Sequence, residues 1–119
     1  MQSELRLHAR MPLDLPAEML LSDEDSADVT LKNLSMGGLM VQGDKRVSQL
    51  LSSHKPGFPV EVELHFGLLE QPVRCHCRLI HAHRQNQNLF NFGFKLLSLG
   101  SESQQLVQQV LAQYEAGRT

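Results

Sequence analysis

The sequence predicts a mainly β protein, a small antiparallel β-barrel closed by one C-terminal α-helix. Three segments, residues 60–66, 73–79 and 90–96, alternate apolar with polar side chains, as strands with one buried face do. Short polar turns separate the strand segments, and such spacing is typical of small barrels. From Leu106 to Tyr114 the apolar residues change to helical spacing, which predicts an amphipathic helix after the last strand.

The first half of the chain supplies shorter elements. Residues 1–12 show no sustained periodicity, so we expect a flexible N-terminal arm ahead of one barrel domain over residues 13–117. The Gly37–Gly38 pair interrupts the alternation between two expected strands. The other expected elements are strands at 17–21, 29–34 and 39–41, a solvated acidic turn at 22–28, and a turn of helix at 47–53.

The second half ends in a polar turn, a strand and the helix. Residues 85–88 are polar and separate the last two expected strands. Ser101 is expected to be the N-cap of the helix, with Gln104 as its partner in a capping box, because the spacing is S-x-x-Q. Gly117 can end the helix.

Length, composition and charge limit the class of protein. The chain has 119 residues, of which 41% are hydrophobic and 20% are charged, so we expect one globular domain. No apolar run is long enough to cross a membrane, the N-terminus lacks a signal-peptide pattern, and two cysteines make no disulfide framework. We therefore expect a cytoplasmic protein without membrane insertion. The net charge of −2 argues against a general nucleic-acid binder.

Arg6 and Arg10 form an R-x-x-x-R pair in the expected arm. Two guanidinium groups four residues apart can converge on one anionic ligand, because each planar fork bonds phosphate oxygens in pairs. The same fork matches the O6 and N7 acceptors of guanine. Taken alone, the pair is weak evidence, and two arginines in a solvated tail are the favoured interpretation.

Asn33, Ser35 and Gly38 form an N-x-S-x-x-G pattern at the end of an expected strand. In an extended strand Asn33 and Ser35 point to the same face, and their short polar groups can bond a base edge. Gly38 leaves room where the backbone bends or a ligand comes close. A plain hairpin with an Asx-type turn and a glycine bulge would show the same residues.

Together the two patterns, separated by 22 residues, resemble the PilZ domain family, the bacterial receptors for cyclic di-GMP. The resemblance extends from Leu5 to about Tyr114 and includes the glycine-containing segment at residues 92–96. It implies a six-stranded antiparallel barrel with a C-terminal helix. Some members of the family lack both motifs and do not bind the nucleotide, whereas this chain keeps both.

The resemblance also implies a role for each motif residue. Arg6 and Arg10 would clamp the phosphates and guanine edges of cyclic di-GMP. Asn33 and Ser35 would bond the other guanine face from the barrel surface. Gly38 would keep the backbone shape and leave clearance for the ligand.

The arm adds two further expectations. His8 lies between the arginines, where it is either a ligand contact or an exposed side chain of the arm. Leu5 stands where a third basic residue would help to hold a second nucleotide, so we expect one ligand per chain. Ordering of the arm on binding would change the surface that an effector protein contacts.

A rival cluster consists of Cys75, Cys77, His81 and His83, which share one face of a straight strand. Cysteine and neutral histidine are zinc ligands. Residues two apart on a strand lie roughly 7 Å apart, which is long for a tetrahedral site and for a disulfide between the cysteines. Core packing of the cysteines is therefore the favoured interpretation, and we expect no metal and no other cofactor.

The sequence shows none of the common catalytic motifs, so we do not expect an enzyme. The expected function is a cyclic di-GMP receptor that relays the signal to an unidentified effector protein in motility, biofilm or virulence control. We expect it to be a monomer or a weak dimer. The alternative is an interaction adaptor with the same barrel that does not bind the nucleotide.

Overall fold

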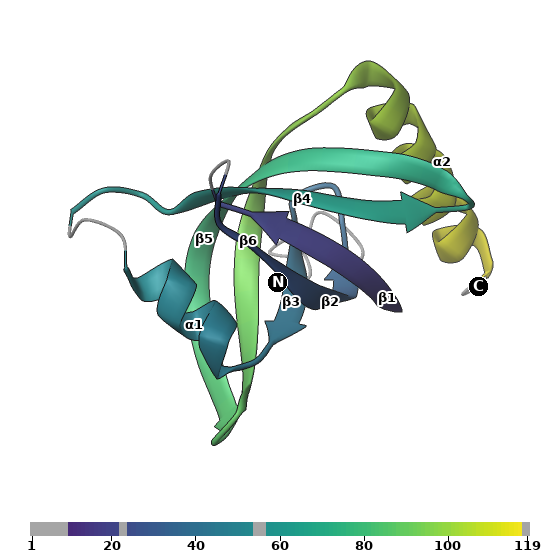
Figure 1. The fold of residues 1–119 in the computed structure, drawn as a ribbon. Helices are drawn as coiled ribbons and strands as arrows, with labels where there is room; N and C mark the ends of the chain where they lie inside the picture. The colour runs from purple at the N-terminus through teal and green to yellow at the C-terminus, as the bar shows by residue number, and fades with distance from the viewer. Residues whose placement is uncertain (1–9, 22–23, 54–56, 118–119) are drawn as a thin grey trace, which may run out of the picture.

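The computed structural model describes residues 10–21, 24–53 and 57–117, and its six strands form a closed antiparallel barrel (Figure 1). The strands neighbour one another in the order β1-β2-β3-β6-β5-β4, with β4 returning to β1. The predicted six-stranded barrel with a C-terminal helix is confirmed. The elements are β1 Met11–Leu20, β2 Ser26–Leu34, β3 Gly38–Gly43, α1 Lys45–Ser52, β4 Glu61–Leu68, β5 Gln71–Asn86, β6 Leu89–Leu99 and α2 Ser101–Gly117.

β1 begins earlier than the sequence predicted. Met11 is 7% exposed and pairs with Leu34, so strand pairing starts two residues before the expected first residue of the barrel domain. The strand also includes Pro16, although proline cannot donate to a ladder. It is tolerated because β1 pairs with β4 only from Ala17 to Leu20.

β2 also differs from its prediction at both ends. It begins at Ser26, so the acidic turn is shorter than 22–28 and Asp28 lies within the strand, opposite Glu18. Near its other end the register shifts between Leu31 and Asn33. This bulge lets Leu31 and Leu34 both enter the core, and it turns Asn33 toward the outer face.

The two helices lie on opposite sides of the barrel in Figure 1. The backbone N–H of Val47 donates to the Asp44 carboxylate at 3.1 Å, and this N-cap starts α1 at Lys45 rather than at the predicted residue 47. No helix in the described ranges is long and apolar enough to cross a membrane.

The predicted capping box of α2 is wrong. Ser101 is already helical, and the N–H of Gln104 donates to the carbonyl oxygen of Gly100 at 2.8 Å. The helix therefore begins directly where β6 ends. The prediction for the other end is confirmed, since Gly117 is the last residue of α2.

The β5–β6 hairpin extends beyond the barrel (Figure 1). β4 pairs with β5 only as far as Arg78, whereas β6 pairs with β5 out to Asn86. The hairpin turn occupies residues 87–88 rather than the predicted 85–88. The outer part of β5 is exposed, so its strand conformation depends on pairing with β6 rather than on burial.

Candidate functional site

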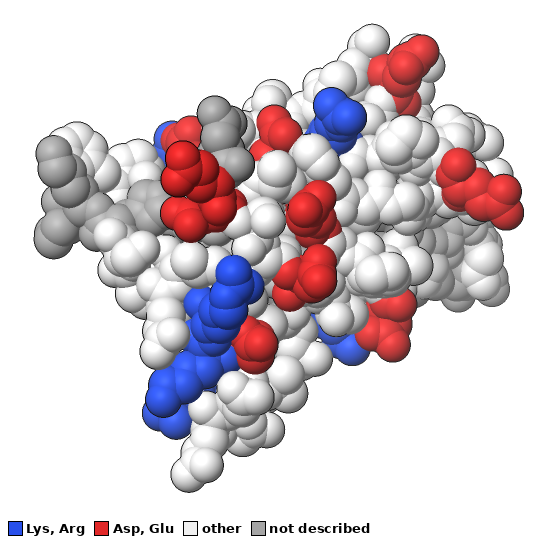
Figure 2. Space-filling view, viewed as in Figure 1, with Lys and Arg blue, Asp and Glu red and all other residues white. Residues whose placement is uncertain are grey.

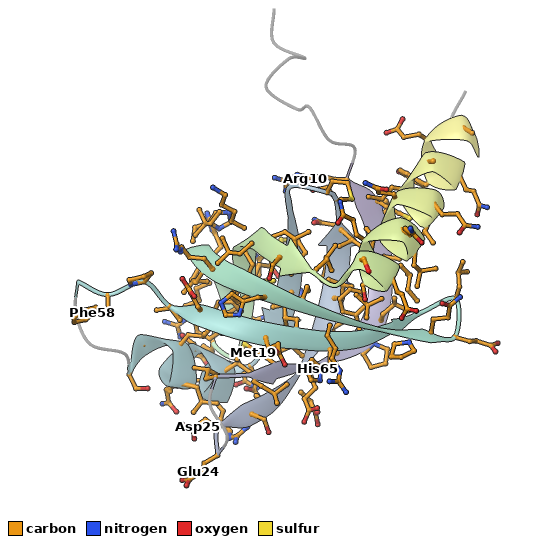
Figure 3. All side chains as sticks on the ribbon, turned by 90° about the horizontal axis from the view of Figure 1, so that it is seen from above. Arg10, Met19, Glu24, Asp25, Phe58 and His65 are labelled. Atoms are coloured by element: carbon orange, nitrogen blue, oxygen red, sulfur yellow. The ribbon has the colours of Figure 1, made fainter. Side chains whose placement is uncertain are left out.

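Four of the predicted ligand residues lie on or beside one end of the β1–β2–β3 sheet. Arg6 and His8 lie outside the described residues. Arg10 is exposed and directly precedes Met11, whose partner is Leu34 (Figure 3). Arg10 is therefore level with the turn that follows Leu34.

That turn is built around the hydroxyl of Ser35. The hydroxyl donates to the carbonyl oxygen of Gly38 at 3.1 Å and accepts from the N–H groups of Gly37 and Gly38 at 3.2 and 3.1 Å. A serine hydroxyl has one donor and two acceptor positions, so all three are used inside the turn. Ser35 is also 6% exposed. Its side chain therefore does not continue an extended strand beside Asn33. The alternative, a hairpin turn at these residues, is the one observed, because the hydroxyl closes a turn.

Gly38 is required by a close backbone approach. A Cβ atom at this position would overlap the carbonyl oxygen of Phe94 on β6. The turn is also fixed to β6, because the N–H of Leu96 donates to the carbonyl oxygen of Gly37 at 3.2 Å. The turn is therefore packed against β6 and hydrogen-bonded to it.

A row of outward-facing residues crosses the sheet beside this turn. Asn33 pairs with Met40, Met40 pairs with Gly93, and Gly93 pairs with His81. Directly opposed residues in antiparallel strands point to the same side, so this row lies on one face. The chain neighbours of Met40 and of Gly93 are buried in the core, which sets that face as the outer one.

Comparison with models of known protein families assigns the chain to a family. The PilZ domain model matches residues 4–113, which is nearly the whole chain. The chain belongs to the PilZ domain family. No curated protein matches it.

Solved structures support this assignment at the level of the fold. The PilZ domain of CeSA from a cellulose-synthesizing bacterium has a TM-score of 0.62 and 19% identity, covering 90% of this chain and 98% of that one. The PilZ domain of YcgR from Escherichia coli with c-di-GMP has a TM-score of 0.63 and 15% identity, covering 95% and 93%. The K. pneumonia MrkH–c-di-GMP complex has a TM-score of 0.71 and 14% identity, covering 95% of this chain but only 54% of that one.

His81 also lies on the outer face of this PilZ domain. From the sequence it was expected to share a face with Cys75 and Cys77. Its ring covers Gly93 so closely that a Cβ there would lie 2.6 Å from ring atoms Cε1 and Nε2. An aromatic ring can cover a glycine on the neighbouring strand. The glycine at position 93 is therefore the sequence signal that could have located His81 on this face. The imidazole therefore lies over Gly93, in the same outward-facing row as Met40 and Asn33.

Lys95 was also missed. It is exposed on β6 and lies directly opposite Gly38. Together with Arg10 it places positive charge beside the Ser35–Gly38 turn. On the face of the PilZ domain that Figure 2 shows, several basic side chains gather at one corner while acidic side chains are spread over the rest, so the net charge does not determine the local charge.

The predicted common face of the cysteines and histidines is wrong. β5 shifts register between Leu79 and His81, and Ile80 is 60% exposed at that bulge. The bulge keeps Cys75 and Cys77 inside and turns the histidines outward. No group of three potential metal ligands occurs among the described residues.

The interpretation of the cysteines as core residues is confirmed, since both are buried. Their Sγ atoms lie 3.6 Å apart, closer than the strand spacing suggested. The contact with Cys75, together with burial, raises the pKa of the Cys77 thiol. Both groups are therefore small apolar fillers of the core rather than reactive thiols.

Two other histidines are held by carboxylates on the β4–β5 face. His76 lies 2.7 Å from Glu61, and His65 lies 2.7 Å from Glu63. The hydrogen bond from His76 lowers the pKa of Glu61, and the bond from His65 lowers the pKa of Glu63. These pairs make a charged outer surface on β4 and β5.

Proposed function

We propose that this PilZ domain binds cyclic di-GMP on the outer face of β2, β3, β6 and β5. The observation that carries the proposal is the row from Asn33 to His81 beside a rigid turn and two cations. A dianionic dinucleotide needs positive charge for its phosphates, a hydrogen-bonding group for a base edge and a flat group for a base face. This surface supplies all three.

Each residue then has a separate task. Arg10 binds phosphate or a guanine edge as a bidentate donor, with Arg6 as its partner, and Lys95 adds charge on the far side of the turn. Asn33 bonds a base edge through its amide. His81 supplies a surface on which a base stacks.

Ser35 and Gly38 act through the backbone. Because the Ser35 hydroxyl is fully used inside the turn, it positions neighbouring groups instead of bonding the nucleotide directly. Gly38 allows β3 to approach β6, and this approach brings Lys95 beside the turn. These tasks involve binding only, and no catalytic step is assigned.

Relay to an effector protein follows from the location of the site. Binding at the first residues of β1 involves the segment that precedes it, and ordering that segment changes the exposed surface. The effector contacts this surface when the nucleotide is bound.

Isothermal titration with cyclic di-GMP tests the proposal. We expect one nucleotide per chain for the wild-type protein. Arg10→Ala should weaken binding by about 10- to 100-fold, since a hydrogen bond to a charged group is worth about 1.5–3 kcal/mol. Arg84→Ala is the matched control, because it removes the same charge from the extended part of β5. Absence of heat with the wild-type protein would favour the adaptor function.

A further inference from the structure

The outer part of β5 has a free backbone edge over residues 80–86. β5 is hydrogen-bonded on both sides as far as Leu79, whose N–H donates to the carbonyl oxygen of Val60 at 2.8 Å. Beyond Leu79, β6 is the only strand that pairs with β5 among the described residues. The other edge of the hairpin is covered, because β3 pairs with β6 out to Phe90. A free edge presents N–H and C=O groups to which a further strand can add.

The free edge is accessible but short. All residues from Ile80 to Asn86 are exposed, and Ile80 is 60% exposed. Register shifts lie on both sides of the segment from His81 to Arg84, so a regular ladder extends over these four residues. Four strand residues cover much less than the roughly 800 Å² per partner that a standard protein interface buries. The edge therefore fits a short extended segment better than a folded domain.

Basic side chains gather at this end of the barrel. Residues 45–53 and 79–95 contain no aspartate or glutamate. Lys45 and Arg46 of α1 and Arg84 of β5 are exposed, and none of the three forms a salt bridge with another described residue. In Figure 2 the basic corner lies over α1 and the β5–β6 hairpin, as Figure 1 places them.

Arg84 and α1 lie on the same side of the hairpin. Arg84 pairs with Phe90, and its guanidinium carbon lies 5.8 Å from the centre of that ring. Phe90 also pairs with Gly43, where an added Cβ would meet Val47 of α1. The backbone N–H of Lys45 donates to the side-chain oxygen of Asn88 in the hairpin turn at 3.3 Å, so α1 begins beside the hairpin. The cations therefore lie on one side of any strand that adds to β5.

We propose that an extended acidic segment of a partner protein adds as a strand to the free edge of β5. The backbone of the segment pairs with residues 81–84. Alternate residues of a strand point to one face, so acidic residues at every second position would all lie on the side of the cations. A second copy of this hairpin would bring the same positive charge, so charge complementarity selects an acidic partner. The interaction does not require cyclic di-GMP, although His81 lies on the same strand.

A short fluorescein-labelled peptide of alternating valine and glutamate tests the proposal. Its fluorescence anisotropy should rise on addition of the protein, and NMR should show slower amide hydrogen exchange at the free edge. A peptide with lysine in place of glutamate keeps the strand preference and should not bind. A glutamate peptide with N-methyl groups on two adjacent central residues keeps the charge and should also fail, because both of its edges are blocked. Equal binding of either control, or protection confined to other residues, would overturn the proposal.

Variants of Arg84 test the charge selection. Arg84→Ala should weaken binding of the glutamate peptide about two- to fivefold, the size expected for one exposed charge pair, and Arg84→Lys should restore it. Arg74→Ala is the matched control, because Arg74 is an exposed arginine in the part of β5 that pairs with β4. Equal losses in Arg84→Ala and Arg74→Ala would contradict the proposed place of binding.

Two further results separate this proposal from its alternatives. A dimer that protects the free edge without any peptide would overturn the proposal and assign the edge to a second copy. Arg84→Ala should leave the Kd for cyclic di-GMP unchanged. Failure of the peptide to bind is therefore distinct from failure of the proposed function, which the nucleotide titration decides by itself.

Discussion

The hydroxyl oxygen of Ser35 lies 3.1 Å from the carbonyl oxygen of Gly38, the residue at the other end of its turn. Ser35 and Gly38 also share a backbone hydrogen bond of 2.8 Å from the Ser35 N–H to the same carbonyl. These two positions of the motif thus form a single structural unit. Their shared task is to hold a turn against β6.

Ser35→Ala should destabilise the fold by about 1–3 kcal/mol, because it removes the three hydrogen bonds that the hydroxyl makes inside the turn. Urea denaturation followed by circular dichroism measures the change. Ser52→Ala is the control, since Ser52 also bonds a backbone carbonyl, that of Ser48, but on the exposed surface of α1. An equal and small loss in both variants would contradict the structural role of Ser35.

Gly38→Ala should cost about 1–3 kcal/mol or more, because the added methyl group meets the backbone carbonyl of Phe94 and one strand must shift. Gly67→Ala makes the same change in β4, where no atom lies within 4 Å of the new Cβ. It should be neutral or slightly stabilising. Thermal denaturation of both variants checks the prediction, which fails if their melting temperatures agree.

His81→Ala should raise the Kd for cyclic di-GMP, by about fivefold to a hundredfold, since stacking of a base on an aromatic ring is worth about 1–3 kcal/mol. His81→Phe should restore most of the affinity because it keeps a flat ring. His83 lies one outward position further along β5, with its ring 6.4 Å from that of His81, so His83→Ala is the control. If His81→Ala binds as tightly as the wild-type protein, the base does not stack there.

The β4–β5 turn should become more stable when its residues are changed to asparagine and glycine. Leu69 and Glu70 both have positive φ, 50° and 62°, a region that costs non-glycine residues energy. Asn-Gly is the preferred pair for such a two-residue turn. Leu69→Asn/Glu70→Gly should therefore add about 1 kcal/mol to the free energy of unfolding. A lower melting temperature would show that Leu69 or Glu70 makes a stabilising contact.

The fold was predictable wherever burial alone selects the conformation. The β4 residues alternate between core and solvent as their sequence does, and α2 buries three residues of the predicted apolar stripe, Leu106, Val107 and Leu111. The outer half of β5 was not predictable, because an exposed polar strand is stabilised by its partner β6. The start of α2 was missed because the end of β6 fixes it, whatever the local capping preference of Ser101.

The candidate site was predictable only in part. Spacing and residue type were sufficient to single out Asn33, Ser35 and Gly38. They did not place His81 or Lys95, because the register of β6 and β5 depends on bulges that have no clear sequence pattern. The turn conformation of Ser35 was not predictable for a related reason, since the strand ends one residue before it.

Barrel closure has a consequence for the order of folding events. The side chains of Gln42 on β3 and Asn91 on β6 are joined by a hydrogen bond although they lie 49 positions apart in the chain. Contacts between distant segments form slowly, because a long loop must close before they stabilise anything. The turn after β2 is made by residues that are close together in the chain. The strand that supports this turn is β6, which must first dock onto β3. A nascent or partly unfolded chain therefore has no assembled outer face around the turn. Under the proposed function, the nucleotide would stabilise only the completed barrel.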